Sequence, residues 1–359
     1  MENASSGASF LHLSDTLMQK IIDENGFKFL FHLRKVCKPL RAFFDNNFHP
    51  NIRLQWMKLS VITNGVWVRF GTDSKDSRYV DYDSEKQGRI LIIDGNEEDW
   101  ETLAMILKYQ TSAMKKLILT YSLDENLVEM SEFLDKFKNF LTTLPSPLRI
   151  EQLHMAASDQ SHVLQILPSF DPTSLECISI LHPKGSETEL ILDEIKELPH
   201  YKNAKEIKID SYNHNFHPYQ FLDFRRCSLK MKLVSVNELI YVLDKIMFTP
   251  IFQSLNLRYS DFDNENRLRQ LWGPPEYPYR TMDPSPYRSR ISERYWYFKF
   301  PNRDILQVCI HDSWNFSVDR LIGEAAELMM EKAKDWQDWI GLGDEENLRM
   351  VMAELGIQE

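Results

Sequence analysis

The residues that could do chemistry in this chain are its histidines, cysteines and carboxylates, and their spacing fits no catalytic pattern. The sequence contains no glycine-rich phosphate loop, no Gly-x-Ser-x-Gly turn and no His-Glu-x-x-His pair. His214 and His217 lie three residues apart, but Asn215 and Pro218 beside them are typical of a turn and not of a metal site. We therefore predict no catalytic residue, no metal site and no cofactor. The chain is expected not to be an enzyme, and an enzyme of an unrecognised type is the alternative.

The cysteines lie far apart, at Cys37, Cys177, Cys227 and Cys309, and no two have the spacing of a metal knuckle or a redox pair. Each lies beside apolar residues, which indicates reduced, partly buried thiols in a reducing compartment. Residues 1–9 have no basic segment and no apolar run, so we expect a flexible N-terminus and not a secretory signal. No stretch approaches the ~18 apolar residues that span a bilayer. We therefore expect a cytoplasmic or nuclear protein without a membrane partner.

The charge of the chain is unevenly distributed. The 359 residues carry a formal net charge of -11, which argues against a nucleic acid partner because phosphate-backbone binding needs a basic face. The stretch from Leu321 to Glu359 has 10 acidic and 3 basic residues, whereas residues 28–41 have five basic residues and no acidic one. The chain therefore has an acidic end and a short basic segment near its start.

Residues 10–50 predict a small helical module. Ser14 can cap a helix whose apolar face continues to Ile22, and Asn25-Gly26 should end that helix. A second apolar stripe with helical spacing runs from Phe27 to Leu40. Helices of this size bury too little surface to be very stable alone. The apolar stripe therefore needs either a partner protein or packing on the rest of the chain.

The second stripe contains the pattern Leu-Arg-Lys-Val-Cys-Lys-Pro-Leu-Arg at residues 33–41. Together with the preceding helical face, it makes the segment from Leu11 to Asp45 resemble an F-box. F-boxes dock on the Skp-type adaptor of cullin ubiquitin ligases, so the resemblance implies this adaptor, and through it a cullin, as partners. It assigns adaptor binding to Leu13, Ser14, Leu17, Ile21, Ile22, Leu30, Leu33, Val36, Cys37, Leu40 and Arg41. F-boxes usually have proline where this chain has Ser14, and the sequence does not tell whether serine weakens adaptor binding.

Residues 51–110 change from helical to strand-like periodicity. Two β-prone runs, 56–62 and 66–70, flank Asn64-Gly65, which predicts a β-hairpin. Residues 79–82 and 90–93 can add strands, and 97–109 have the apolar spacing of a helix. We interpret this segment as a bridge or cap before the next domain.

A short pattern recurs from residue 114 onward: an apolar residue, two others, an apolar residue, one other, an apolar residue. Its copies begin at Met114, Ile150, Leu175, Ala204, Ser228 and Phe252, which are 36, 25, 29, 24 and 24 residues apart. Leucine-rich repeats have a similar period of ~20–29 residues. Helical stripes at 127–141, 189–197 and 236–248 separate the copies, and strands at 295–300 and 305–310 would close the stack. We predict a leucine-rich-repeat-like α/β solenoid or, alternatively, an ordinary α/β sheet; both have mostly parallel strands.

Two stretches of this region, 164–180 and 202–209, are similar to the FTH domain, which accompanies F-boxes in a family greatly expanded in nematodes. The resemblance implies substrate recruitment to a Skp-cullin-F-box ubiquitin ligase, while other subunits transfer ubiquitin. The alternative is a protein-binding module that holds a partner without ubiquitin transfer. The predicted fold class is α+β, with a small helical F-box (10–50), the bridge (51–110), the solenoid (111–320) and an acidic helical tail (321–359).

Strand positions outside the apolar pattern would line one extended surface of a solenoid. They are Lys116, Gln152, His154, Glu206, Lys208, Lys230, Lys232, Ser254, Asn256 and Arg258. Their mixture of charged, amide and hydroxyl groups is typical of a protein-recognition face, and a plain solvated face is the alternative. The protein substrate itself cannot be named from the sequence.

Two further segments have open roles. The segment from Gly273 to Tyr287 is rich in proline and tyrosine, and it is either a partner-binding excursion or an ordinary loop. After Asp319 the apolar spacing predicts a helix that includes Leu321 and Ile322 and continues toward Trp336 and Trp339. This acidic tail either packs on the end of the domain or binds a partner helix.

Overall fold

In the computed structural model the chain divides into two compact units, Met1–Ile150 and Glu151–Glu359. The residues described are 53–62, 65–71, 89–93, 97–108, 110, 112–121, 127–182, 190–210, 216–262, 265–273, 275, 293–299, 304–311 and 315–327, together with Ser14, Leu17, Lys20, Val36, Lys38, Arg41 and Ala42. The predicted strand at 79–82, most of the loop 273–287 and the tail beyond residue 327 lie outside this set.

The first unit contains a sheet in the order β4-β1-β2-β3. Strands β1 (Trp56–Ile62) and β2 (Gly65–Gly71) form the antiparallel hairpin that Asn64-Gly65 predicts. Strand β3 (Arg89–Ile93) pairs with β2, as expected for a strand at 90–93. Strand β4 (Met114–Tyr121) pairs in parallel with β1. The segment 51–110 therefore shares a sheet with the first copy of the repeat pattern.

Helices cover the apolar side of this sheet. Helix α4 (Glu97–Lys108) and helix α5 (Leu127–Thr142) confirm the predicted stripes. Their buried side chains include Leu103, Ile106, Met130, Phe133, Leu134, Phe137 and Leu141. The rings of Phe133 and Phe137 stack at 5.8 Å. Each such side chain contributes roughly 1.5–3 kcal/mol by leaving water, so the helical spacing in the sequence accounts for the core.

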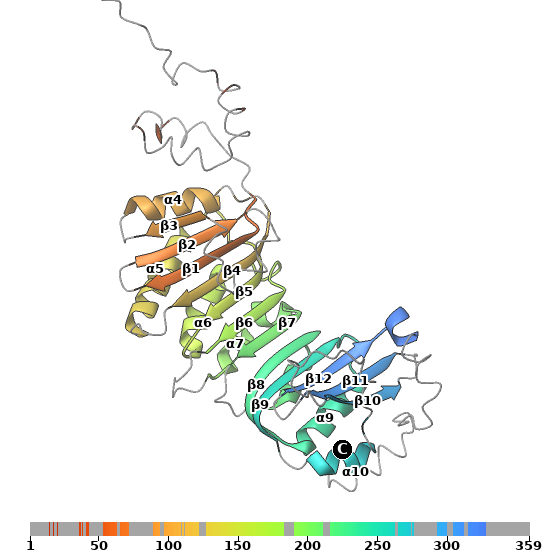
Figure 1. Cartoon of the computed structure of the whole chain (residues 1–359). Helices are drawn as coiled ribbons and strands as arrows, with labels where there is room; N and C mark the ends of the chain where they lie inside the picture. Colours follow the sequence, from red (N-terminus) through yellow and green to blue (C-terminus); the bar gives the residue numbers. More distant parts are fainter. Residues whose placement is uncertain are drawn as a thin grey trace, which may run out of the picture. The chain divides into compact units, whose positions relative to one another are not determined.

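The second unit begins with parallel strands that follow each other in chain order (Figure 1). They are β5 (Ile150–Ala156), β6 (Cys177–Leu181), β7 (Glu206–Asp210), β8 (Arg226–Val234) and β9 (Ser254–Phe262). Leu153, Ile178, Ile207, Cys227 and Leu255 occupy equivalent positions on neighbouring strands. These strands confirm the prediction of mostly parallel pairing.

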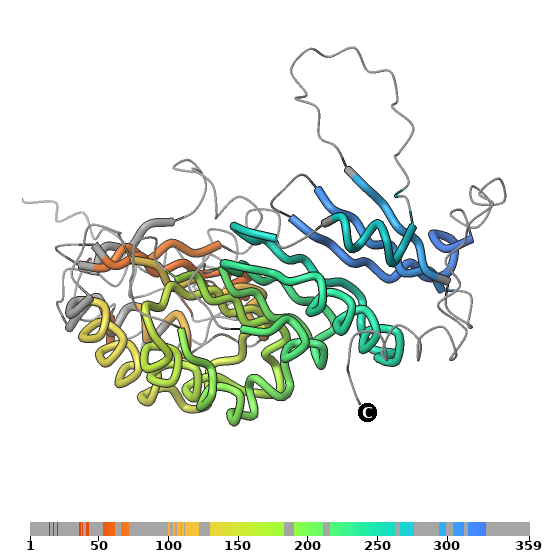
Figure 2. The backbone as a smooth tube through the Cα atoms, turned by 90° about the horizontal axis from the view of Figure 1, so that it is seen from below, coloured from red at the N-terminus to blue at the C-terminus, as the bar shows by residue number. Residues whose placement is uncertain are grey.

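Short helices connect these strands. Helices α6 (Gln160–Ile166), α7 (Asp193–Glu197) and α8 (Pro199–Asn203) lie on one side of the strands in Figure 2. Helix α9 (Val236–Met247) confirms the predicted stripe at 236–248. The predicted helix at 189–197 is too long, because residues 190–192 are not helical and Pro199 starts a separate helix.

The repeat pattern was placed wrongly on β8. The copy that begins at Ser228 predicts Ser228, Met231 and Leu233 as core residues, but Ser228 is only half-buried and Leu233 is 52% exposed. The copy that matches the neighbouring strands is Phe224-Cys227-Leu229, four residues earlier, and all three side chains are buried. The error arose because Met231 is also buried, so the nine-residue strand fits two overlapping frames.

Antiparallel strands complete the second unit in the order β9-β12-β11-β10. Strands β10 (Glu293–Lys299) and β11 (Ile305–His311) confirm the predicted last pair. Strand β12 (Asn315–Leu321) was not predicted and inserts between β9 and β11. The predicted helix after Asp319 is therefore wrong at Leu321, which is the last residue of strand β12. A helix begins only at Glu324, after Gly323 adopts a φ of 57°.

Helix α10 (Glu265–Trp272) lies between β9 and β10 in the chain and packs on the antiparallel strands. Trp272 meets Trp296 and Phe298 edge-to-face, with ring centroids 5.6 Å apart in each pair. These contacts bury the inward side of β10, so the alternate residues Tyr295 and Tyr297 point to the opposite side of the sheet.

Candidate functional site

One side of the strands in the second unit carries polar residues, and we call it the outer face. Successive side chains of a strand point to opposite sides, so the buried set that packs toward the helices fixes which residues point outward. Pairing places the outward residues in three rows. The first row is Gln152, Cys177, Glu206, Arg226, Ser254 and Asp319; the second is His154, Ser179, Lys208, Ser228, Asn256 and Ser317; the third is Ala156, Leu181, Asp210, Lys230, Arg258 and Asn315.

Most residues of the predicted recognition face lie on the outer face. These are Gln152, His154, Glu206, Lys208, Lys230, Ser254, Asn256 and Arg258, and alternation along β8 adds Lys232. Lys116 lies in the first unit on β4 and is only 9% exposed, so it offers little of its side chain to a partner. Sequence reasoning missed Arg226 and Ser228 because the pattern was misplaced on β8. It also missed the residues of β12, because that strand was not predicted.

Two carboxylates organise the centre of the outer face. Glu206 lies 3.0 Å from the Lys208 Nζ and 3.9 Å from the Arg226 Nε. Asp210 lies 2.8 Å from the Lys230 Nζ and 3.9 Å from an Arg258 guanidinium nitrogen. The register explains the geometry, since β7 lies beside β8 and β8 beside β9. Glu206 is therefore shared between Lys208 and Arg226, and Asp210 between Lys230 and Arg258.

Three of the four cations in this cluster are more exposed than the carboxylates, and the fourth, Lys230, is only 12% exposed. The side chains of Lys208, Arg226 and Arg258 are 42%, 56% and 49% exposed, whereas Glu206 and Asp210 are 19% and 35% exposed. Exposed ion pairs contribute only about 0.2–1 kcal/mol each, because water and salt screen them. The arrangement therefore presents positive charge to solvent without depending on it for stability.

Burial favours the neutral form of the Cys177 and Cys227 thiols. Burial raises the pKa of the Cys177 thiol to about 12, and the nearby Glu206 carboxylate adds to the effect. Burial also raises the pKa of Cys227 well above its ordinary value. Cys177, Cys227 and Cys309 are free and buried, whereas Cys37 lies outside the described residues. Neutral thiols are poor nucleophiles, so burial disfavours nucleophilic chemistry at Cys177 and Cys227.

The far end of the outer face differs from its centre. Burial raises the pKa of Asp319, although the nearby His311 opposes this shift. His311 Nε2 lies 3.2 Å from the Ser317 hydroxyl. The rings of Tyr295 and Tyr297 stack on the edge of β10 with centroids 6.2 Å apart and planes 7° from parallel. The antiparallel strands therefore add an aromatic contact surface beside the charged centre.

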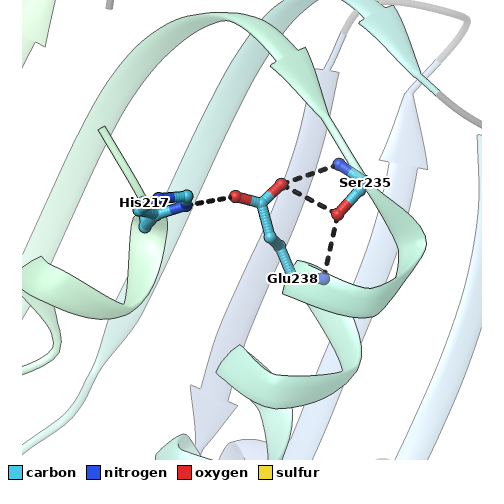
Figure 3. A network of polar contacts seen from close by, with 3 residues as sticks. All are labelled: His217, Ser235 and Glu238. Carbon is cyan, nitrogen blue, oxygen red and sulfur yellow. Dashed lines mark hydrogen bonds and ion pairs between the residues drawn. The ribbon is translucent and has the colours of Figure 1, made fainter. Parts of the chain in front are cut away.

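Figure 3 shows the contacts of His217, which the sequence placed in a turn. His217 begins the 3-10 helix at Pro218–Phe221, and its Nδ1 lies 2.6 Å from the Glu238 Oε1. The other Glu238 oxygen accepts hydrogen bonds of 2.9 Å from both the backbone N–H and the hydroxyl of Ser235. The serine hydroxyl contacts the carboxylate and not the imidazole. This arrangement caps helix α9 and does not activate a nucleophile.

Within the part of the chain that the structure describes, no group of histidine, cysteine and carboxylate side chains could hold a metal ion. In the same part, no helix is both long enough and apolar enough to cross a membrane.

Ser14, Leu17, Val36 and Arg41 are the predicted docking residues that the structure describes. The Leu17 N–H lies 2.9 Å from the Ser14 carbonyl oxygen and 3.4 Å from its hydroxyl, so Ser14 occupies the predicted helix-capping position. Leu17 is 46% exposed and Val36 is 67% exposed, and both are helical. The remaining docking residues lie outside the described set. They are Leu13, Ile21, Ile22, Leu30, Leu33, Cys37 and Leu40.

Comparison with protein families gives one match: residues 131–274 match the FTH domain. The match runs from within α5 to the end of α10, and it includes strands β5 to β9 with the centre of the outer face. This segment is similar to the FTH domain, and FTH domains are associated with F-box proteins. No curated protein and no solved structure matches the chain.

Proposed function

We propose, from the FTH domain as the premise, that this chain is the substrate-recognition subunit of a Skp-cullin-F-box ubiquitin ligase. In this role residues 10–50 form an F-box that docks the Skp-type adaptor, and the outer face binds a protein substrate. The observation that carries the proposal is the FTH domain, which lies downstream of an F-box-like pattern in the order typical of such receptors.

The docking half is supported by what the N-terminal residues present to solvent. Leu17 and Val36 are exposed apolar side chains, each on a helical residue, at positions that the F-box resemblance assigns to adaptor binding. Burying such a side chain in an interface is favourable, so the module has surface to offer a partner. The Ser14 cap supports helix formation at the position where F-boxes usually have proline.

The arrangement of strands and helices in the FTH segment supports the proposed binding of a substrate. Consecutive parallel strands with helices on one side leave the outer face accessible, which is how leucine-rich-repeat-like solenoids bind proteins. We propose that the second unit is such a solenoid. Its outer face mixes charged, amide and hydroxyl groups, as protein-binding surfaces do. The chain would supply proximity between substrate and ligase in the cytoplasm or nucleus and would transfer no ubiquitin itself.

Co-purification with a Skp-type adaptor and a cullin tests this function. The double variant Leu17→Asp/Val36→Asp introduces two charges at exposed docking positions, and we expect it to lose the adaptor. The matched control is Phe248→Asp/Ile251→Asp, which changes two exposed apolar residues of the second unit and should keep the adaptor. The proposal fails if the wild-type chain captures no adaptor, or if the two double variants behave alike.

The same experiment separates the alternative function. A module that holds a partner without ubiquitin transfer would capture the adaptor but no cullin. Recovery of both proteins supports the ligase, because the adaptor reaches the cullin through a surface of its own. The variant Ser14→Pro restores the residue that is usual in F-boxes and should bind the adaptor at least as well as the wild-type chain.

A further inference from the structure

The outer face carries a cluster of basic residues that contrasts with the rest of the chain. We call Lys208, Arg226, Lys230, Lys232 and Arg258 the cationic strip; they lie on β7, β8 and β9. The whole chain has a net charge of -11. An excess of positive charge in one place on an acidic protein is not expected from composition alone, so the strip calls for a binding role.

The ion pairs leave the strip with a positive excess. Glu206 and Asp210 are shared among four of its cations, and Lys232 adds a fifth. Two of the four contacts are long, since the Arg226 and Arg258 nitrogens lie 3.9 Å from their carboxylates. Lys208, Arg226 and Arg258 are more exposed than their carboxylates, whereas Lys230 is only 12% exposed. An incoming carboxylate can therefore reach Lys208, Arg226 or Arg258 from solvent without displacing a buried group.

We propose that the cationic strip binds an acidic, extended peptide segment of the substrate protein. This proposal rests on the proposed function, because it names the kind of substrate that the recognition half would take. The peptide carboxylates would share the strip cations with Glu206 and Asp210, and Arg226 and Arg258 would provide planar, forked donors for them. Charge complementarity identifies the occupant: an acidic segment gains attraction at the strip, whereas a basic segment is repelled.

The register suggests how such a peptide lies. The strip crosses three neighbouring strands, and two further strands separate β9 from the stacked tyrosines of β10. Strands lie roughly 4.8 Å apart, so the distance from β7 to β10 is about 24 Å, which an extended chain covers in about seven or eight residues. We expect the acidic residues at one end of such a segment and an apolar or aromatic residue over Tyr295 and Tyr297 at the other.

A nucleic acid is the competing occupant of a cationic surface. Phosphate-backbone binding draws on many cations along a basic face, whereas the strip has five cations around two carboxylates in an acidic protein. The acidic peptide is therefore the better fit, and the oligonucleotide becomes an outcome of the test.

Fluorescence anisotropy with the full chain tests the proposal, using a fluorescein-labelled peptide of ten glutamates as the probe. The first variant, Lys208→Gln/Arg258→Gln, removes one cation from each carboxylate and should weaken binding about fivefold or more. The second, Glu206→Gln/Asp210→Asn, releases the four paired cations and should strengthen binding by about the same factor. Binding should also weaken as salt rises. A purely structural ion-pair cluster would not produce the gain in the second variant.

Matched controls are available on α5, where Glu132, Asp135, Lys136 and Lys138 are exposed. Lys136→Gln/Lys138→Gln and Glu132→Gln/Asp135→Asn make the same changes in net charge away from the strip, and each should stay within about twofold of wild type. The proposal is overturned if the strip variants behave like these controls or if a ten-glutamine peptide binds as tightly. It is also overturned if a single-stranded oligonucleotide binds more tightly through the same residues.

Failure of the acidic-peptide proposal and failure of the proposed ligase function give different experimental results. The peptide assay uses neither adaptor nor cullin, and the adaptor experiment uses neither the strip nor the peptide. A chain that captures adaptor and cullin but shows no strip-dependent peptide binding keeps its ligase role and loses this substrate class. A chain that binds the peptide as expected without an adaptor keeps the acidic-segment site and loses the ligase role.

Discussion

The two units use the outward side of their strands in different ways. In the first unit, Trp56 covers the part of the sheet beside Lys116, since Trp56 is 1% exposed and packs against Gly71 on the neighbouring strand. In the second unit, the outer face is open and charged, with cations that reach solvent around Glu206 and Asp210. Both units are built from strands of five to nine residues, so the difference lies in the side chains.

The contrast teaches that the same strand pattern can serve stability in one place and recognition in another. A tryptophan that fills the space over a glycine buries a large apolar area and tolerates no change of shape. Exposed ion pairs contribute little to stability and can be exchanged for contacts with a partner. The stability of the second unit therefore depends on the side of the sheet that packs against the helices. Three variants test this comparison, from the largest expected effect on stability to the smallest.

Gly71→Ala should destabilise the protein most, by about 1–3 kcal/mol. A Cβ at this position would lie 2.5 Å from the Trp56 Nε1 and 2.7 Å from its Cε2, and the rigid indole ring has to shift to make room. Chemical denaturation followed by tryptophan fluorescence measures the loss. The double variant Gly71→Ala/Trp56→Phe supplies the control, because the smaller ring should recover part of the lost stability. Equal stability of Gly71→Ala and wild type would show that this side of the first unit is not tightly closed.

The strands were predictable wherever the spacing of apolar residues allowed only one placement of the repeat pattern. The Asn64-Gly65 pair predicted the hairpin of β1 and β2, and the copies at Ile150, Leu175, Ala204 and Phe252 lie at strands of the structure. On β8, buried Met231 allowed two frames, so the repeat pattern was placed four residues too late. Local periodicity cannot choose between such frames, because only pairing with the neighbouring strands distinguishes them.

The candidate site was only partly predictable for the same reason. Alternation along each strand identified Glu206, Lys208 and Arg258 as outward residues, yet nothing in the sequence placed them beside each other. Ion pairs such as Asp210 with Lys230 depend on the register between β7 and β8. Strand β12 was overlooked because its short alternating run leads directly into helical spacing, and only its pairing with β9 identifies it as a strand.

Glu238→Gln should have the second-largest effect, and the effect should depend on pH. Burial tends to raise the pKa of Glu238, but hydrogen bonds from Ser235 and His217 outweigh this and hold the pKa below its ordinary value of 4.5. A carboxyl with a lowered pKa in the folded state stabilises the protein above the unfolded pKa, and this contribution is lost as pH falls through the folded value. Glutamine keeps a neutral cap at the same position.

Urea unfolding of wild type and Glu238→Gln at several pH values measures this contribution. We expect wild type to be more stable by about 0.3–1 kcal/mol at pH 7, as is typical of a carboxylate in the first turn of a helix. The difference should shrink below about pH 4.5 as the carboxylate is protonated. A difference that stays constant from pH 7 to pH 3 would mean that the charge of Glu238 does not stabilise helix α9.

Glu206→Gln/Asp210→Asn should have the smallest effect on folding, although it changes two central residues of the outer face. Both replacements keep the size of the side chain and an amide oxygen that can still accept a hydrogen bond from Lys230, which is only 12% exposed. The three more exposed cations remain hydrated. We therefore expect the free energy of unfolding to stay within about 0.5 kcal/mol of wild type. The same urea titration measures it at pH 7. A loss as large as that of Gly71→Ala would mean that these carboxylates hold the strands together. The cationic strip would then be part of the framework, and the contrast between the two units would disappear.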